Sequence, residues 1–242
     1  MDLNMKLTGA LFLIGGGADL VFADFAHLAG GRSAHIVVIT HASRSPRESG
    51  DAIVAGLLKH GVTRVTVITP EGDQRLPAGT TAILIGGGDQ NRLVKLLEGS
   101  GLGQEIRDAN RRGILVGGTS AGAAAAAHVM MAGETDDYRK GVIKQGTILL
   151  GKGLCLLSGV VIDTHFRQRV RQARLRMALG TMDGVVGVGL DEDTAVYIKG
   201  RHVRVYGSGK VSVYTAGGGT TFQTIARKAK RRLYRAGDKF RL

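Results

Sequence analysis

Short apolar runs recur along the first half of the chain, and three of the five end at glycines. The runs are "ALFLI" (10–14), "AHIVVIT" (34–40), "RVTVI" (64–68), "TAILIGG" (81–87) and "ILVGG" (114–118). They are nearly continuous in apolar residues rather than alternating, and strands of that kind are buried on both faces. Residues 49–61, 90–99 and 102–113 lie between them and have helical spacing. The sequence therefore predicts an α/β fold, a predominantly parallel sheet with helices on both faces.

The second half of the chain follows a different pattern. A strand-like run ends in "GVVIDTHF" (159–166), and the basic segment "RQRVRQARLRMALG" (167–180) predicts a helix. Strand-like runs with short turns between them follow: "GVVGVGL" (184–190), "TAVYIKG" (194–200), "HVRVYG" (202–207) and "VSVYTA" (211–216). Short connections favour antiparallel pairing. We therefore expect an antiparallel β extension in the C-terminal part.

Composition indicates one globular unit. The chain has 242 residues, of which 43% are hydrophobic and 22% charged, with three prolines and no evident linker or repeat. This predicts a single domain over 1–242. Its one cysteine, Cys155, excludes an internal disulfide and a cysteine-based zinc site, and its apolar surroundings predict a buried structural thiol.

Targeting and membrane signals are not evident in the sequence. No run approaches the roughly 20 apolar residues of a membrane span, and the N-terminal segment lacks a signal-peptide cleavage pattern. We expect a cytoplasmic protein without a membrane partner. No metal-ligand motif and no cofactor motif is evident, so we expect neither a metal nor a cofactor.

The charge is strongly positive and unevenly distributed. The formal net charge is +13, and a basic C-terminal tail, about 226–242, holds eight lysines and arginines but one acid. Such a balance is compatible with a polyanion or RNA as partner. Aromatic residues make up 5% of the chain and no nucleic-acid motif is evident, which argues against nucleic acid. Three readings of the tail stay open: a solvated helix, a contact with a polymeric substrate, or an extension without contacts.

The stretch "GGTSAGAAAAAH" contains the strongest chemical motif. Gly118 to Gly122 reads G-x-S-x-G between a predicted strand and a predicted helix over 121–133, which is the context of a nucleophile elbow. Small neighbours permit the tight turn, and the backbone N–H of Ala121 is placed to stabilise an oxyanion. The alternative is a serine that only caps an alanine-rich helix.

A serine nucleophile needs a base and an orienting acid. Among the seven histidines, His165 is the best candidate because it ends a strand at the carboxyl edge, where open α/β sheets bind ligands. His41 also follows a strand and stays open. The turn "GLDEDT" (189–194) offers Asp191, Glu192 and Asp193 as the acid, and the residues alone do not choose among them.

Four motifs in one order resemble a known family. "GGGDQNRL", "GGTSAGAA", "DTHFRQRVRQARL" and "GLDEDTA" are similar to those of cyanophycinases and their relatives in the S51 serine peptidases, over about residues 15–222. The resemblance implies a class I glutamine amidotransferase-like fold and a homodimer, so the single domain over 1–242 is expected to be catalytic. It also implies hydrolysis of cyanophycin, an arginyl-poly-aspartate, to β-Asp-Arg dipeptides through an acyl-enzyme at Ser120.

The resemblance also implies roles for individual residues. Ser120 is the nucleophile, His165 the base and Glu192 the acid partner. The implied substrate-binding residues are Gln90, Asp163, Thr164, Arg169, Arg171 and Arg174. Arginines suit a substrate rich in carboxylates, because their planar fork binds carboxylate bidentately. In this pattern Asp163 lies beside the arginine side chain of the substrate.

Some features of the site stay open. Thr164 departs from the glutamine common at its position, and Arg174 from an expected lysine, which puts strict specificity in question. The glycines of "GGGDQ" (86–90) let a backbone N–H approach the substrate carbonyl, so Gly88 or Asp89 is expected as the second oxyanion donor. Two rival functions remain: another S51-like peptidase, such as an α-aspartyl dipeptidase, and a non-catalytic polyanion- or RNA-binding protein.

Overall fold

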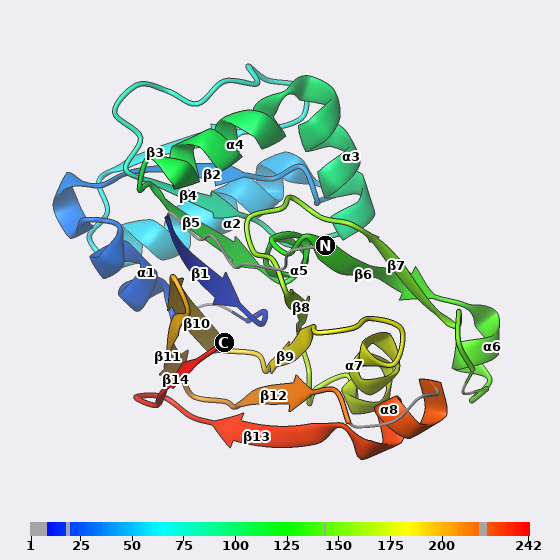
Figure 1. The fold of residues 1–242 in the computed structure, drawn as a ribbon. Helices are drawn as coiled ribbons and strands as arrows, with labels where there is room; N and C mark the ends of the chain where they lie inside the picture. Colours follow the sequence, from blue (N-terminus) through cyan, green and yellow to red (C-terminus); the bar gives the residue numbers. More distant parts are fainter. Residues whose placement is uncertain (1–8, 18–19, 143, 218–221) are drawn as a thin grey trace.

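A mixed β-sheet forms the centre of the molecule (Figure 1). The structure is a computed structural model that describes residues 9–17, 20–142, 144–217 and 222–242. Within these ranges eight strands form the large sheet, in the order β14-β11-β10-β1-β5-β4-β2-β3. The strands are β1 (Ala10–Ile14), β2 (His35–Ile39), β3 (Arg64–Ile68), β4 (Ala82–Ile85), β5 (Leu115–Thr119), β10 (Thr194–Lys199), β11 (His202–Gly207) and β14 (Lys239–Arg241).

The two halves of this sheet differ in strand direction. Neighbours from β1 through β5, β4 and β2 to β3 are parallel, whereas β10, β11 and β14 continue the sheet beyond β1 with antiparallel pairing. The predicted α/β class with an antiparallel extension is confirmed.

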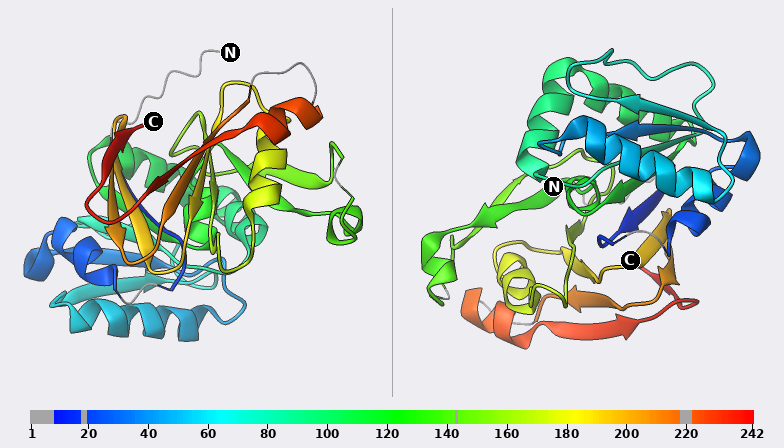
Figure 2. Two further views of the ribbon diagram at one scale, coloured as in Figure 1. Left: turned by 90° about the horizontal axis from the view of Figure 1, so that it is seen from below. Right: turned by 180° about the vertical axis from the view of Figure 1, so that it is seen from behind.

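Helices cover both faces of the parallel half (Figures 1 and 2). Because side chains alternate along a strand, Leu11 and Leu13 pack toward α3 (Gln90–Ser100), α4 (Leu102–Arg111) and α5 (Ala121–Ala125). Phe12 and Ile14 pack on the opposite face, toward α1 (Phe22–Leu28) and α2 (Pro46–Lys59). All four side chains are fully buried, which explains why this run contains no polar residue.

Two smaller sheets lie beside the large one. The first has the order β13-β12-β9-β8, and the second is the hairpin of β6 and β7, which with α6 projects from the body of the molecule (Figure 2). The strands are β6 (Val129–Glu134), β7 (Ile148–Lys152), β8 (Val160–Asp163), β9 (Val186–Leu190), β12 (Val211–Thr215) and β13 (Lys230–Tyr234). The remaining helices are η1 (Gly31–Ser33), α6 (Asp136–Arg139), α7 (Gln172–Leu179) and α8 (Phe222–Lys228).

The predicted helix over 121–133 is wrong in its second half. Helix α5 ends at Ala125, and Val129–Glu134 form β6, which pairs with β7. The carbonyls of Ala125 and Ala126 accept hydrogen bonds from the backbone of Leu154 and Leu156 instead of continuing the helix. Tertiary pairing overrides the helix propensity of alanine here.

The predicted helix over 167–180 starts later than expected. Helix α7 begins at Gln172, after a turn over 166–171 in which Val170 has φ 50°. The N–H of Arg167 donates to the Asp191 carboxylate and the N–H of Arg171 to the Phe166 carbonyl, which hold the turn in this shape. A β-branched residue rarely adopts this conformation, so the sequence favoured helix.

The basic C-terminal tail belongs to the sheets. Strand β13 pairs with β12 and β14 pairs with β11, so these segments are neither a solvated helix nor an extension without contacts. Contact of the tail with a polymeric substrate stays a prediction. The predicted burial of Cys155 is also wrong, because this residue is partly exposed, and its Sγ lies 3.2 Å from Nδ1 of the exposed His128. No helix in the described ranges has the length and apolar character needed to cross a bilayer.

Because α5 lies close to the sheet, substitution by alanine should have opposite effects on stability at Gly122 in α5 and at Gly99 in α3. A Cβ on Gly122 would lie 2.4 Å from the Ile85 carbonyl oxygen, whereas a Cβ on Gly99 in α3 meets nothing within 4 Å. Alanine gains up to about 1 kcal/mol over glycine in a helix, but forcing a methyl into packed backbone costs about 1–3 kcal/mol.

We therefore expect Gly122→Ala to lower the free energy of unfolding by about 1–2 kcal/mol and Gly99→Ala to raise it slightly, as measured by urea denaturation. Equal stabilities of the two variants would contradict the close packing of α5.

Candidate active site

Ser120 lies in a strained turn between β5 and α5. Its φ is 51° and its ψ is −111°, a conformation that costs free energy for any residue other than glycine. The Ser120 N–H donates to the Ile14 carbonyl at the end of β1. A Cβ on Gly118 would lie 2.5 Å from the backbone of Gly122, so the flanking residues must be small. The turn presents the hydroxyl at the carboxyl edge of the parallel strands, as a nucleophile elbow does.

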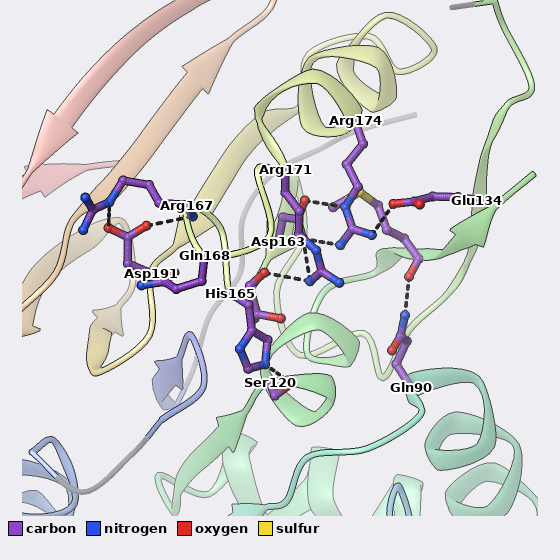
Figure 3. Close-up of polar contacts among 12 residues, drawn as sticks. Gln90, Ser120, Glu134, Asp163, His165, Arg167, Gln168, Arg171, Arg174 and Asp191 are labelled. Carbon is purple, nitrogen blue, oxygen red and sulfur yellow. Dashed lines mark hydrogen bonds and ion pairs between the residues drawn. The ribbon is translucent and has the colours of Figure 1, made fainter. Parts of the chain in front are cut away.

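Three side chains form a continuous hydrogen-bonded chain from this turn. Ser120 Oγ lies 2.7 Å from His165 Nε2 (Figure 3), and His165 Nδ1 lies 2.6 Å from Glu192 Oε1. His165 follows β8, and Glu192 lies in the turn between β9 and β10. Since Nδ1–H donates to Glu192, Nε2 is left as the acceptor for the serine proton. This is the geometry of a nucleophile, a base and an orienting acid.

The two neighbouring acids are placed differently. Asp191 is fully buried and accepts hydrogen bonds from the backbone and Nε of Arg167 and from the backbone of Lys210. The N–H of Asp193 donates to the carbonyls of Gly16 and Gly17. Glu192 is therefore the acid that contacts the histidine, a choice that residue types alone left open.

The first glycine cluster, Gly15 to Gly17, supports the turns that hold His165 and Glu192. The Gly15 carbonyl accepts the N–H of His165 at 2.7 Å, and the Gly16 carbonyl accepts the N–H of Asp193 at the same distance. A Cβ on Gly16 would lie 2.1 Å from His165 Cε1, and Gly16 has φ 103°. The imidazole thus lies against bare backbone, and the cluster "GGG" after the first strand was the sequence signal for this contact.

The surroundings of His165 keep it neutral. Burial lowers its pKa below the ordinary value of about 6.5; the hydrogen bond to Glu192 opposes this shift, and the charges of Arg169 and Arg171 add to it. A neutral imidazole can accept the serine proton at neutral pH.

The backbone N–H groups near Ser120 are not equivalent. The N–H of Asp89 donates to the Ala42 carbonyl at 2.9 Å, and the Asp89 side chain caps α3 by accepting from Asn91 and Arg92. Asp89 is therefore not available as an oxyanion donor, which corrects that expectation. Gly88 and Ala121 line the cavity beside Ser120, and none of the hydrogen bonds of the described residues uses the Gly88 N–H.

A small cavity of about 50 Å³ collects most of the expected site residues. Those that line it are Ser120, Ala121, Gly88, Gln90, Asp163, Thr164, Arg169, Arg171 and Arg174. Gln90 also donates from Nε2 to the Met131 carbonyl at 2.9 Å, which ties the start of α3 to β6 (Figure 3). His41, the other histidine left open as the base, is buried and its Nε2 lies 2.7 Å from Gln74 Oε1.

An ion-pair network occupies one wall of the cavity. Asp163 is buried, and Arg174 binds both of its carboxylate oxygens; the Nε–Oδ2 distance is 2.8 Å. Arg174 also reaches Glu134 Oε1 at 2.7 Å (Figure 3). Burial alone would lower the pKa of Arg174, but Asp163 and Glu134 raise it above its usual value, so the guanidinium stays charged. Asp163 and Arg174 thus satisfy each other. Glu134 was not among the expected site residues: it lies just past the helix predicted over 121–133, and only the strand β6 brings it to this wall.

The other two arginines of the cavity, Arg171 and Arg169, make fewer contacts with acidic side chains than Arg174. Arg171 Nη1 donates to the Thr164 carbonyl at 2.7 Å and lies 3.4 Å from Asp163 Oδ1. Arg169 is exposed, and no ion pair of the described residues involves its side chain. Arg169 thus lines the cavity with a guanidinium that no acid of the described residues neutralises. Within the described ranges no cluster of three or more His, Cys, Asp or Glu is arranged to hold a metal ion.

Comparison with known proteins agrees with this geometry. The model of peptidase family S51 matches residues 11–206. The cyanophycinase of Geminocystis herdmanii is 35% identical over 226 residues, which cover 87% of this chain and 82% of that protein.

Solved structures show the same fold. A peptidase from an acI-B1 Actinobacterium has TM-score 0.70 and 19% identity, covering 99% of this chain and 98% of that one. A putative peptidase E from Listeria monocytogenes has TM-score 0.60 and 18% identity, covering 85% and 100%. These neighbours confirm the class I glutamine amidotransferase-like fold. The chain therefore belongs to peptidase family S51 and is a serine peptidase.

Proposed function

We propose that this serine peptidase hydrolyses cyanophycin to β-Asp-Arg dipeptides as an exopeptidase, through an acyl-enzyme at Ser120. The observation that carries the chemistry is the hydrogen-bonded chain from Ser120 through His165 to Glu192. The observation that favours the substrate is the group of arginines beside the nucleophile, together with the similarity to a cyanophycinase over most of the chain.

The proposed reaction has two stages. Ser120 Oγ attacks the scissile carbonyl while His165 Nε2 accepts its proton, and the oxyanion is held by the N–H groups of Gly88 and Ala121. The protonated imidazole then gives its proton to the leaving amine, which departs and leaves an ester on Ser120. Water attacks the ester with His165 Nε2 accepting its proton. The protonated imidazole then gives this proton to Ser120 Oγ as the ester bond breaks, which releases the carboxylic acid product and restores the free hydroxyl. Glu192 orients the ring and stabilises its positive charge at both stages.

Substrate binding rests chiefly on Arg169 in this proposal. Among the described residues no carboxylate pairs with its guanidinium, which lines the same cavity as Ser120. A carboxylate near the end of the polymer is a suitable partner, since arginine binds it bidentately. Arg171 contributes a second positive charge at the cavity.

A second candidate has support from the ion-pair network. Asp163, which the family resemblance placed beside the arginine side chain of the substrate, is already bound by Arg174. Thr164 is smaller than the glutamine common at its position. A pocket of this kind favours substrates without an arginine branch, such as α-aspartyl dipeptides.

An assay on both substrates separates the two candidates. We expect the wild-type protein to release β-Asp-Arg from cyanophycin, detected by mass spectrometry, and Ser120→Ala to lose at least about 10³-fold in rate, because the nucleophile is absent. A panel of α-aspartyl dipeptides is run in parallel. Cleavage of the dipeptides alone would reject cyanophycin as the substrate, and an active Ser120→Ala protein would reject the proposed nucleophile.

The lowered pKa of His165 predicts the pH dependence. The base must be neutral, so kcat/KM should be constant above this pKa and fall as the pH drops through it, with an inflection below pH about 6.5. Since the Arg169 charge contributes to the shift, Arg169→Gln should move the acid limb to higher pH and also raise KM.

The matched control is Arg47→Gln, an exposed arginine on α2, which should leave the profile unchanged. An acid limb that does not move in Arg169→Gln would contradict the electrostatic coupling between Arg169 and His165.

A further inference from the structure

The positive charge of this protein is concentrated in its C-terminal fifth. Residues 195–242 contain 12 of the 33 lysines and arginines but one of the 20 acidic residues, and thus carry +11 of the net charge of +13. These residues include β11, β12, β13 and β14 and most of β10. The mechanism proposed above uses none of this charge.

Strand register places part of this charge in two cross-strand rows on one face of the large sheet. Lys199 of β10 lies opposite His202 of β11, which lies opposite Arg241 of β14. One pair further along, Tyr197 lies opposite Arg204, and Arg204 opposite Lys239. We call these six residues the basic sheet face.

The basic sheet face is open, and its lysines and arginines form no ion pairs with the acids that the structure describes. All six residues except Tyr197 are exposed, while the alternating residues Ile198 and Val203 are buried in the core on the other side. No ion pair of the described residues involves Lys199, Arg204, Lys239 or Arg241.

Like charges directly opposite each other destabilise a sheet, and an anionic ligand would relieve this repulsion. Asp24 of α1 acts on Arg204 through its charge, but no ion pair joins the two side chains.

An open hollow with aromatic side chains lies within this face. It measures about 660 Å³ and lies between Leu28 of α1 and the strands β10, β11 and β14. Tyr197 and Tyr206 line it, both partly exposed, and the guanidinium of Arg204 lies 5.3 Å from the centre of the Tyr206 ring. The surface thus combines planar side chains with repeated positive charge.

We propose that the basic sheet face binds single-stranded nucleic acid. A row of cations suits the phosphates, and tyrosine rings and the Arg204 guanidinium plane are surfaces on which bases stack. An acidic polypeptide would satisfy the charges but would leave the hollow and its rings without a partner. An anionic bilayer requires apolar side chains that project from the surface, whereas here they line a hollow behind a rim of charge.

The face is separate from the peptidase site. Ser120 and Glu192 lie at the carboxyl end of β1, where Ile14 pairs with Ala195. Lys199, His202 and Arg241 lie at the other end, opposite Ala10. Changes on the basic sheet face should therefore leave peptide hydrolysis intact.

Binding of a fluorescein-labelled oligouridylate of about 15 nucleotides, followed by fluorescence polarisation, tests the proposal on the full chain. With four phosphate contacts, the affinity should fall about 50-fold between about 50 and 200 mM salt. The double variant Arg204→Glu with Lys239→Glu should weaken binding at least about tenfold, and Tyr197→Leu about fivefold or more. Hydrolysis by the active protein serves as the check that each variant is folded.

The matched control makes the same charge change on another surface. The control is the double variant Arg47→Glu with Lys59→Glu, whose two residues are exposed on α2. It changes the net charge of the protein by the same amount but leaves the basic sheet face intact, so its affinity for the oligonucleotide should stay within about twofold of wild type. Equal loss in the two double variants, or no binding by the wild type, would overturn the proposal.

Two competitors test the kind of partner. Poly-aspartate is added at the same concentration of negative charges as the oligonucleotide. If it displaces the oligonucleotide and Tyr197→Leu has no effect on binding, the surface is a polycarboxylate site and the nucleic-acid assignment is wrong. If vesicles with anionic lipid displace it equally well, the assignment is also wrong. Failure of poly-aspartate and vesicles to compete, together with a loss in Tyr197→Leu, supports it.

Discussion

The close approach of α5 to the parallel strands is the constraint on which the site depends. Ser120 has a positive φ, and its turn is possible only because Gly118 and Gly122 bring backbone against backbone with no side chain between them. The four alanines of α5 extend the same requirement into the buried helix. The strain of this turn is tolerated because the turn is fixed to the sheet, through the hydrogen bond that the Ser120 N–H donates to the Ile14 carbonyl.

The electrostatics around Ser120 follow from burial and from which arginines are paired with acidic side chains. Asp163 is buried and requires a partner, which Arg174 supplies, and Glu134 satisfies the rest of that guanidinium. Arg169 has no such partner among the residues that the structure describes, and its charge helps to hold His165 neutral. Arg174 thus stabilises the wall of the cavity, while Arg169, only five residues before it in the sequence, acts through its charge on His165.

The antiparallel half of the sheet has two faces with different roles. Ile198 and Val203 pack into the core, so β10 and β11 close the sheet beside β1 and help to carry the turn that holds Glu192. The opposite face carries like charges directly across the strands, an arrangement that does not stabilise the fold. A surface that contributes little to stability and keeps a strong field is suited to binding a polyanion.

Much of this protein was determined by its sequence alone. Continuous apolar runs predicted the parallel strands, since such runs are stable only when both faces are covered, and G-x-S-x-G between a strand and a helix indicated the elbow at Ser120. The S51 motifs indicated the family. Local patterns erred where tertiary contacts decide, as in 121–133, where the backbone after Ala125 pairs with other segments instead of continuing a helix.

Only the tertiary structure decided which acid contacts His165, that Asp89 has no free N–H, and that Asp163 and Arg174 bind each other. It also decided that the basic tail completes two sheets and places Arg204 opposite Lys239. These outcomes depend on distances between residues far apart in the chain, and such distances are set by packing and strand register, which composition and local spacing do not encode.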